Sequence, residues 1–361
     1  MFTERIYNFS AGPSMLPEPV LKRVQGELLN YGGTGIAVME MSHRSKMYLD
    51  IFEGVKARVC EVLDIPEGYH VLFAHGGATA QFSAIPMNLI GEGSADYAIT
   101  GNFAQLAAAE AKKYGRINII YDTSDKNHTY IPRQTDLKFT PDASYFHYCA
   151  NNTIFGTAWD YIPDTGGKPL VSDMSSCILS EPLDVSKFGL IYAGAQKNIA
   201  PSALALLILK DGLPVKPITA IPKVLDYNLM IKNDSMLNTP PTFNIYILGL
   251  VLDWIKGLGG LTAMREINRA KAAVLYDFLD NSAFYNAPAV KSARSIMNIT
   301  FRTPNEELDA AFAKESAAAG LANLKGHRLV GGMRASIYNA MPLEGVKKLV
   351  EFMGNFERKN S

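Results

Sequence analysis

The sequence predicts an α/β protein with a mostly parallel β-sheet, and three observations lead to this fold class. Short apolar runs recur along residues 69–209, helical patterns separate several of them, and glycine-containing turns connect strand to helix. Apolar strands that alternate with helices are typical of a parallel sheet covered on both faces. We therefore expect a central sheet with helices packed on either side.

The first expected strand, at 69–74, is followed by a glycine-rich turn and a helix that starts near residue 81. The second, at 95–100, leads into an alanine-rich helix over 103–115, which Gly115 is expected to end. The remaining strands of this region are expected at 117–122, 143–150, 168–175, 190–195 and 204–209.

The pattern changes near residue 258, where we place a domain boundary. Helical stretches at 245–260 and 261–282 come first, and shorter alternation follows, as in a smaller α+β domain. The expected elements are a strand at 295–303, a helix at 307–321, a strand at 334–340 and a final helix at 342–359.

Composition narrows the functional class. The chain has 35 Lys+Arg and 35 Asp+Glu, which argues against bulk attraction to nucleic acid or anionic membranes, so any phosphate recognition must be local. The three cysteines, Cys60, Cys149 and Cys177, form no CxxC pair, which disfavours a disulfide scaffold and a zinc site. The N-terminus lacks the apolar core of a signal peptide, and no apolar run is long enough for a membrane span. We expect a cytoplasmic protein without a metal.

Polar groups follow three of the predicted strands, where ligands bind in parallel α/β sheets. HGGATAQF (75–82) suits an anion at a helix N-terminus, although it is neither GxGxxG nor a P-loop and could be a plain turn. Asp173 could cap a helix, bind a metal or face a cationic ligand. Lys197 could form an ion pair or, when partly desolvated, act as a neutral nucleophilic amine.

Together, an anion-binding turn, an acid and a lysine on one sheet edge are what pyridoxal 5′-phosphate requires. The acid keeps the pyridine nitrogen protonated, and the lysine holds the aldehyde and later moves the substrate α-proton. Phe103, which follows the strand at 95–100, is placed to stack on the ring, the alternative being a core aromatic residue.

At this point the chain resembles a known family nearly end to end. The motifs that carry the resemblance are NFSAGPSMLPEPVL (8–21), MSHRSK (41–46), HGGATAQF (75–82), NNTIFGT (151–157), SDMSS (172–176), YAGAQKN (192–198), NTPPTF (238–243) and HRLVGGMRASIYNAMP (327–342). They resemble those of the class V aminotransferases, which are pyridoxal phosphate enzymes of fold-type I, the aspartate aminotransferase-like fold. The resemblance implies a large cofactor-binding domain over 16–258 and a small domain made of 1–15 and 259–361.

The resemblance also implies roles for individual residues. Lys197 would bind the cofactor covalently, Asp173 would meet the pyridine nitrogen, and Phe103 would stack on the ring. The other implied cofactor contacts are Ala78, Thr79, Thr153, Gln196, Asn238 and Thr239. Of these, Asn238 and Thr239 would reach the phosphate from the other subunit of a homodimer with shared active sites.

For the substrate, the resemblance implies that Arg334 anchors the α-carboxylate and that Ser10 lies nearby. His43, Arg44, His327 and Arg328 would hold the distal phosphate or carboxylate, whose geometry a guanidinium matches; a solvated surface loop is the alternative for each His–Arg pair. The implied reaction transfers an amino group between L-glutamate and 3-phosphohydroxypyruvate, giving 2-oxoglutarate and O-phospho-L-serine. A companion activity on 4-phosphohydroxy-L-threonine, in vitamin B6 synthesis, is also implied.

Two positions depart from the pattern. Some relatives carry arginine where Thr79 stands and tryptophan where Phe103 stands, so one phosphate contact is absent or replaced and the indole N–H is missing.

Two alternative functions stay open at this point. A cysteine desulfurase-like enzyme would need a mobile active-site cysteine, and none of the three lies in a Gly/Ser-rich loop near the motifs; another small-substrate aminotransferase is a related alternative. A non-catalytic pyridoxal phosphate carrier would not need the substrate-binding arginines.

Overall fold

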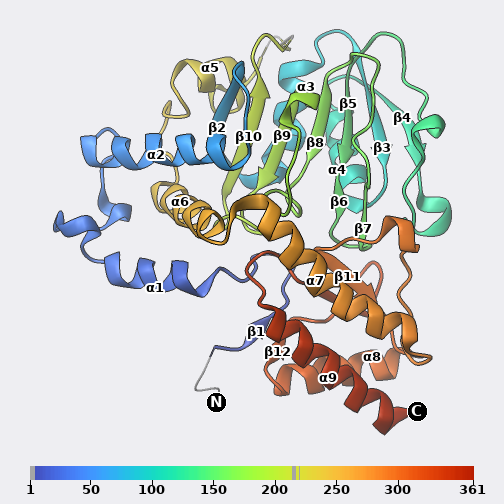
Figure 1. Ribbon diagram of the computed structural model, residues 1–361. Helices are drawn as coiled ribbons and strands as arrows, with labels where there is room; N and C mark the ends of the chain where they lie inside the picture. Colours follow the sequence, from blue (N-terminus) through green and yellow to red (C-terminus); the bar gives the residue numbers. More distant parts are fainter. Residues whose placement is uncertain (1–4, 214–216, 219) are drawn as a thin grey trace.

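The computed structural model describes residues 5–213, 217–218 and 220–361. Its centre is a seven-stranded sheet in the order β2-β10-β9-β8-β5-β3-β4 (Figure 1). The strands are β2 (Tyr69–His75), β3 (Ser94–Ile99), β4 (Arg116–Asp122), β5 (Ala143–Cys149), β8 (Leu170–Asp173), β9 (Leu190–Gly194) and β10 (Leu204–Lys210). Only β10 runs antiparallel to its neighbours in this sheet, so the predicted α/β class with a mostly parallel sheet is confirmed.

Helices cover both faces of the sheet. The helices of the large part of the chain are α1 (Glu18–Glu27), α2 (Lys46–Val62), α3 (Gly77–Leu89), α4 (Asn102–Ala111), α5 (Tyr227–Lys232) and α6 (Thr242–Gly257). Along β10, Leu206 and Ile208 pack in the cluster that includes α2 and α6, whereas Ala205 and Leu207 pack in the cluster with α3 and α4. Successive side chains of a strand point to opposite faces of the sheet. A strand in a sheet that helices cover on both faces therefore needs apolar side chains at consecutive positions.

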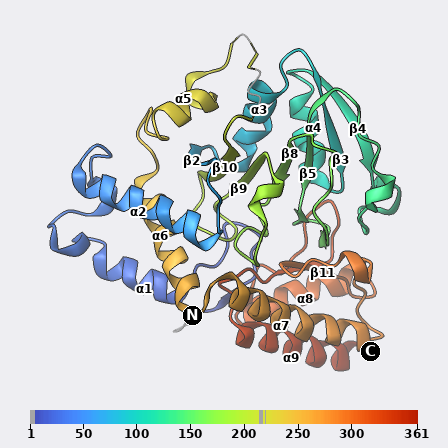
Figure 2. The same cartoon turned by 45° about the horizontal axis from the view of Figure 1, so that its top comes forward.

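The remaining elements form a separate layer below the sheet, seen in both views (Figures 1 and 2). They are α7 (Gly260–Asn281), α8 (Glu306–Ala318), α9 (Leu343–Asn360), β11 (Asn298–Phe301) and β13 (Met333–Ser336), with β11 and β13 antiparallel. Near the N-terminus, β1 (Tyr7–Asn8) pairs in parallel with β12 (Leu321–Ala322). Phe9 packs in an apolar cluster with side chains of α7, α8 and α9. The division into two domains stays a prediction, and residues 1–4 of it lie outside the described residues.

A buried lysine links α7 to the segment that follows β13. Lys271 is fully buried, and its Nζ donates hydrogen bonds to the carbonyl oxygens of Ile337 (3.0 Å) and Tyr338 (2.8 Å). Burial lowers the pKa of Lys271 to about 7. The two carbonyl oxygens therefore bind an amine that loses its proton more readily than an ordinary lysine does.

Several element boundaries differ from the sequence prediction. The alanine-rich helix ends at Ala111 rather than at Gly115, whose added Cβ would lie 2.6 Å from Ile90 Cδ1, so this glycine serves packing. The helix predicted over 307–321 ends at Ala318, because Gly320 turns the chain at φ 81° and Leu321 enters β12. Helices α1 and α2 were not predicted.

Short elements complete the described chain. They are the hairpin strands β6 (Asn151–Asn152) and β7 (Thr157–Ala158), and the 3₁₀ turns η1 (Tyr31–Gly33), η2 (Val38–Glu40), η3 (Ser124–Lys126), η4 (Gln134–Asp136), η5 (Val185–Lys187), η6 (Lys223–Leu225) and η7 (Lys291–Ala293).

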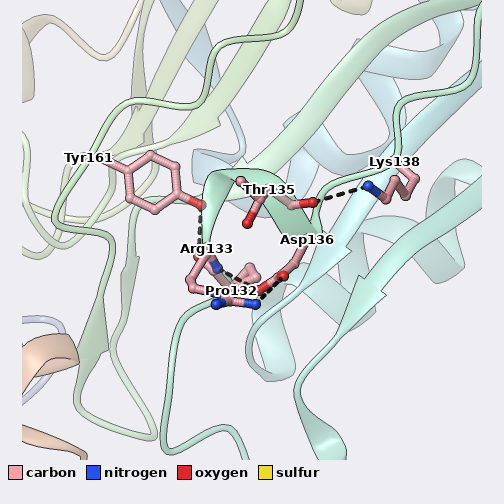
Figure 3. Close-up of polar contacts among 6 residues, drawn as sticks. All are labelled: Pro132, Arg133, Thr135, Asp136, Lys138 and Tyr161. Carbon is pink, nitrogen blue, oxygen red and sulfur yellow. Dashed lines mark hydrogen bonds and ion pairs between the residues drawn. The ribbon is translucent and has the colours of Figure 1, made fainter.

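The connection from β4 to β5 is tied to the segment after β7. Around η4, the Arg133 guanidinium donates to both carboxylate oxygens of Asp136 at 2.9 and 3.1 Å (Figure 3). The Tyr161 hydroxyl donates to the Pro132 carbonyl oxygen at 2.7 Å. The Gln134 side chain also exchanges hydrogen bonds with the backbone of Asp164 at 2.8 and 2.9 Å, so Tyr161 and Gln134 together join the two segments. The ion pair of Arg133 and Asp136 lies within one segment at the surface and contributes little stability.

No single helix in the described ranges is long and apolar enough to cross a membrane. The pair α6 and α7 meets the criteria only when taken together, across a bend of 82°, and most residues of α6 are buried inside the protein.

Candidate active site

Lys197 lies in the turn after β9, at the edge of the sheet. Its Nζ donates a hydrogen bond to Thr153 Oγ1 at 2.9 Å and lies 4.8 Å from the centre of the Phe103 ring. Burial lowers the pKa of Lys197, and the negative charge of Asp173 opposes this shift. The side chain thus has the surroundings of a lysine that can supply a neutral amine.

The N-terminal segment lies against Lys197. The Ser14 N–H donates to the carbonyl oxygen of Gln196 at 2.9 Å, and the Ser14 hydroxyl donates to that of Lys197. A Cβ on Gly12, whose φ is 145°, would lie 3.3 Å from Lys197 Cγ. Ser10 accepts a hydrogen bond from the Gly12 N–H at 3.4 Å, so the predicted substrate residue lies in the segment that covers the lysine.

Asp173 is the last residue of β8 and is 7% exposed. Its Oδ1 accepts hydrogen bonds from the N–H of Ser175 at 2.9 Å and from the Ser175 hydroxyl at 2.5 Å. No helix directly follows β8, so Asp173 caps none. The described residues also contain no cluster of His, Cys, Asp and Glu suited to a metal. A partner for a cationic ligand is the interpretation that the surroundings favour.

The turn before α3 has the features of an anion site. Gly76 and Gly77 have φ values of 83° and 62°, and a Cβ on Gly76 would lie 2.7 Å from Ala80 Cβ, so the turn requires glycine there. Ala78 and Thr79 lie in the first turn of α3, where N–H groups have no partner within the helix.

Gln196 adds a polar side chain to this turn. Its Oε1 is buried, finds no hydrogen-bond partner among the residues that the structure describes, and lies 3.8 Å from the place a Cβ on Gly77 would take. A side-chain amide can turn to present its NH₂ group to an anion. This unpartnered amide beside a helix N-terminus fits the phosphate of pyridoxal 5′-phosphate, while Phe103, Asp173 and Lys197 fit its ring and aldehyde.

Arg334 reaches the same site from β13. Its Nη1 donates to the Thr153 carbonyl oxygen at 3.3 Å, and its positive charge further lowers the pKa of Lys197. His327 lies close by: burial and the charges of Arg334 and Arg328 lower its pKa, so its imidazole is neutral at neutral pH. Arg328 is exposed.

Glycines close the loop that carries His327 and Arg328. The Gly326 N–H donates to the Gly332 carbonyl oxygen at 2.8 Å, and a Cβ on Gly326 would lie 2.0 Å from the Gly331 oxygen. A larger residue at 326 would open the loop, so its shape depends on this glycine.

In the described residues, no contact within the chain brings four of the predicted site residues to Lys197: His43, Arg44, Asn238 and Thr239. In the described ranges no hydrogen bond or ion pair joins His43 or Arg44 to the site, and their segment precedes α2 at the outer left of Figure 1, away from β8 and β9. Asn238 Nδ2 lies 3.1 Å from His75 Nε2, beside the turn that begins α3, and Thr239 follows it.

Sequence reasoning missed residues that hold the predicted ones in place. Ser175 binds Asp173, Ser176 accepts a hydrogen bond from Thr153 Oγ1 at 3.0 Å, and the Tyr338 hydroxyl donates to the Ala11 carbonyl oxygen at 2.9 Å. For Ser175 a signal existed, because Asp-x-Ser often forms a local turn closed by the Asp side chain. Tyr338 had no such local signal.

The cysteines do not have the environment of a desulfurase nucleophile. All three are free thiols, and burial raises the pKa of Cys60, Cys149 and Cys177. Since the thiolate is the nucleophile, a raised pKa makes these side chains weaker nucleophiles than an ordinary cysteine.

Comparisons with known proteins agree with this geometry. The family model described as aminotransferase class-V matches residues 6–349. Phosphoserine aminotransferase of Pseudomonas paraeruginosa is 51% identical over 358 residues, which cover 99% of this chain and 99% of that protein.

Solved structures are similar over the same extent. Phosphoserine aminotransferase from Bacillus circulans subsp. alkalophilus is 44% identical with a TM-score of 0.97, covering 99% of this chain and 100% of that one. A pyridoxal phosphate-bound phosphoserine aminotransferase from Trichomonas vaginalis is 38% identical with a TM-score of 0.92, covering 97% and 100%.

Proposed function

The chain belongs to the class-V aminotransferase family, and from this premise we propose how its residues carry out the reaction. It is a pyridoxal 5′-phosphate-dependent transaminase with phosphoserine aminotransferase activity. It transfers an amino group between L-glutamate and 3-phosphohydroxypyruvate, giving 2-oxoglutarate and O-phospho-L-serine, a reaction of serine biosynthesis. The observation that carries the residue assignment is Lys197, held between Thr153 and Phe103 at the sheet edge that ends in Asp173.

The cofactor, when bound, supplies an aldehyde that accepts the amino group and a ring that withdraws electrons from the substrate α-carbon. Lys197 would hold the aldehyde until the substrate amino group takes its place, and the released Nζ would then be the base that accepts the proton from the substrate α-carbon and gives it back when the amino group has been transferred. The lowered pKa supports this role, since a base must be neutral before it can accept a proton.

Asp173 keeps the ring nitrogen protonated, and Phe103 stacks on the ring. Thr153 Oγ1, now bonded to Lys197 Nζ, lies where it can meet the ring hydroxyl. A buried carboxylate at a strand end and an aromatic ring beside the amine support these assignments.

The phosphate is held by the N–H groups of Ala78 and Thr79, by the Gln196 amide, and by Asn238 and Thr239. The glycine turn and the unpartnered Gln196 Oε1 support this set. Because net charge is zero, the dipole of α3 and these directed groups must supply the binding.

The substrate α-carboxylate binds Arg334, beside Ser10, and the distal anion binds a basic cluster. We assign to that cluster the residues His43, Arg44, His327 and Arg328. One pocket then accepts the γ-carboxylate of glutamate in one half-reaction and a phosphate in the other. A neutral His327 beside two guanidinium groups supports this, since it can donate a hydrogen bond to either anion.

The active form is a homodimer with shared sites. Among the described residues, no hydrogen bond or ion pair joins His43 or Arg44 to the site of their own chain, and exposed apolar side chains precede them: Leu28, Leu29, Ile36 and Met39. An apolar patch next to unused basic residues suits a second copy of the chain.

Mixed dimers test the shared site. Chains with Lys197→Ala are mixed with chains in which Asn238 and Thr239 are replaced by alanine and valine. Recovery of activity, with hybrid formation verified, is expected, because one site then has an intact lysine and an intact partner segment. No recovery would mean that Asn238 and Thr239 serve their own chain, as the bond to His75 allows.

The half-reaction tests the function itself. Adding L-glutamate to the pyridoxal phosphate-loaded enzyme should bleach the visible band, and 3-phosphohydroxypyruvate should restore it. A carrier protein would keep the band unchanged. A screen of other phosphorylated keto acids, including that of 4-phosphohydroxy-L-threonine, tests the proposed companion activity. We also propose a cytoplasmic location, which the three free thiols support.

A further inference from the structure

The two carboxylate oxygens of Asp173 have different surroundings. Oδ1 accepts two hydrogen bonds from one residue, the Ser175 N–H at 2.9 Å and the Ser175 hydroxyl at 2.5 Å. Oδ2 has the thiol of Cys149, with Sγ at 3.9 Å. A thiol is a weak donor, and this one is at the limit of a contact. Within the described ranges, Oδ2 therefore has no strong donor.

The direction of the Ser175 hydroxyl follows from its other partner. Ser175 Oγ also accepts a hydrogen bond from the Gly194 N–H at 2.9 Å. An N–H can only donate, and a serine hydroxyl has one proton. That proton is therefore directed to Asp173 Oδ1, and since Ser175 is 2% exposed, water does not compete for it.

Ser175 also joins two sheet ends of the site. Asp173 ends β8, and Gly194 ends β9, three residues before Lys197. A Cβ on Gly194 would lie 3.2 Å from Ala78 N, so this strand end also adjoins the anion-binding turn. One hydroxyl thus fixes the acid relative to the strand that carries the lysine.

We propose that Ser175 is a positioning residue that commits Oδ1 of Asp173 to the protein and leaves Oδ2 for the protonated ring nitrogen of the cofactor. This inference rests on the proposed role of Asp173. If Oδ1 had no hydrogen bond, the carboxylate group of Asp173 could rotate, and neither of its oxygens would be fixed toward the ring nitrogen. With Oδ1 bound by Ser175, Oδ2 faces the protonated ring nitrogen, and no other strong donor among the described residues competes for its negative charge.

The test uses the pyridoxal phosphate-loaded enzyme and four variants. Ser175→Ala removes the hydroxyl and keeps the N–H bond, and Ser175→Cys keeps the volume with a weak donor. Ser180→Ala is the matched control, because Ser180 is equally buried in the same segment and donates to the Cys177 carbonyl oxygen, away from Asp173. Ser175→Thr, which retains a hydroxyl, is the rescue variant.

The decisive measurement is the pH at which the visible absorption of the bound cofactor changes. A protonated ring nitrogen withdraws electrons and lowers the proton affinity of the nitrogen that joins cofactor to lysine. A weaker hold by Asp173 therefore moves this transition to higher pH in Ser175→Ala and Ser175→Cys. Ser180→Ala should titrate as wild type, and Ser175→Thr should lie closer to wild type than Ser175→Ala.

Kinetics and cofactor binding give further readouts. In Ser175→Ala, kcat should fall about ten- to a hundred-fold, while KM for glutamate changes by less than about three-fold because Arg334 is intact. The affinity of the cofactor-free variant for pyridoxal phosphate, followed by fluorescence, should fall by about ten-fold.

A wild-type titration and a wild-type kcat in Ser175→Ala would overturn the proposal. If that variant does not fold, Ser175→Cys decides by the same measurement. Failure of the wild-type enzyme to react with glutamate would instead contradict the proposed function. The absorption titration stays informative in that case, because it requires only bound pyridoxal phosphate.

Discussion

Replacing Lys197 with methionine should abolish transamination while the protein still folds. Methionine has nearly the length of lysine and carries no amine, so the cavity stays filled and the base is lost. Proton transfer by a positioned group contributes roughly 10²–10⁴-fold. Since the variant also loses the covalent attachment of the cofactor, we expect kcat/KM to fall by at least about 10⁴-fold, which corresponds to about 5 kcal/mol.

The effect on stability should be small, because the contacts of the amine offset its burial. In the described residues Lys197 Nζ has one hydrogen bond, to Thr153 Oγ1, worth about 1 kcal/mol net, and its contact with the Phe103 ring adds attraction only while the amine is protonated. Against these stands the burial that lowers its pKa. The free energy of unfolding of the cofactor-free variant should therefore stay within about 2 kcal/mol of wild type.

The assay combines turnover, urea unfolding and chemical labelling. Lys210→Met, at the exposed end of β10, is the matched control and should keep full activity. Borohydride reduction of the native enzyme should attach the cofactor to Lys197, as peptide mass analysis would show. A label on another lysine, or turnover above about one per cent in the folded variant, would refute the assignment.

Three further predictions concern the acid, the arginines and the buried lysine. Asp173→Asn should keep bound cofactor but lose most activity, because an amide does not hold a protonated ring; near-native kcat at full occupancy would contradict this. Arg44→Ala and Arg328→Ala should lower kcat/KM for O-phospho-L-serine more than for L-glutamate, since a phosphate dianion carries more charge, by the roughly 1.5–3 kcal/mol of a hydrogen bond to a charged group. Arg334→Ala should lower both similarly, and the reverse pattern in steady-state kinetics would overturn this division. For Lys271 the folded pKa of about 7 lies below the ordinary 10.5, so the unfolded chain binds more protons between these values and the free energy of unfolding rises with pH. Lys271→Met should lack this rise in urea unfolding of the cofactor-free protein at pH 7 and pH 9, and an identical rise would show that another group causes it.

The local pattern of the chain was sufficient for the sheet and for part of the site. Most strands of the central sheet contain a short apolar run, as at 71–74 in β2 and 204–209 in β10, and burial on both faces favours such a run wherever a strand lies inside the sheet. Lys197, Asp173 and the turn at 75–82 could be found because each lies at or just beyond the end of such a strand. A polar residue next to a buried run has few explanations, so its position carries information by itself.

Other features depended on which distant segments meet. The antiparallel direction of β10 follows from how the chain returns after β9, and no residue in it encodes a direction. The start of β12 depends on a distant partner, because Leu321, just beyond the turn at Gly320, pairs with Tyr7 from the other end of the chain. Such boundaries depend on a partner strand that the local sequence does not contain.

The same limit applies within the site. Arg334 and Ser10 belong to opposite ends of the chain, and the resemblance to a family, rather than any spacing, placed them with Lys197. The sequence by itself determined which groups have chemistry to offer, because residue type and strand position are local properties. Only the tertiary structure decided that Ser175 occupies one oxygen of Asp173, because a hydrogen bond depends on distances between atoms that folding alone brings together.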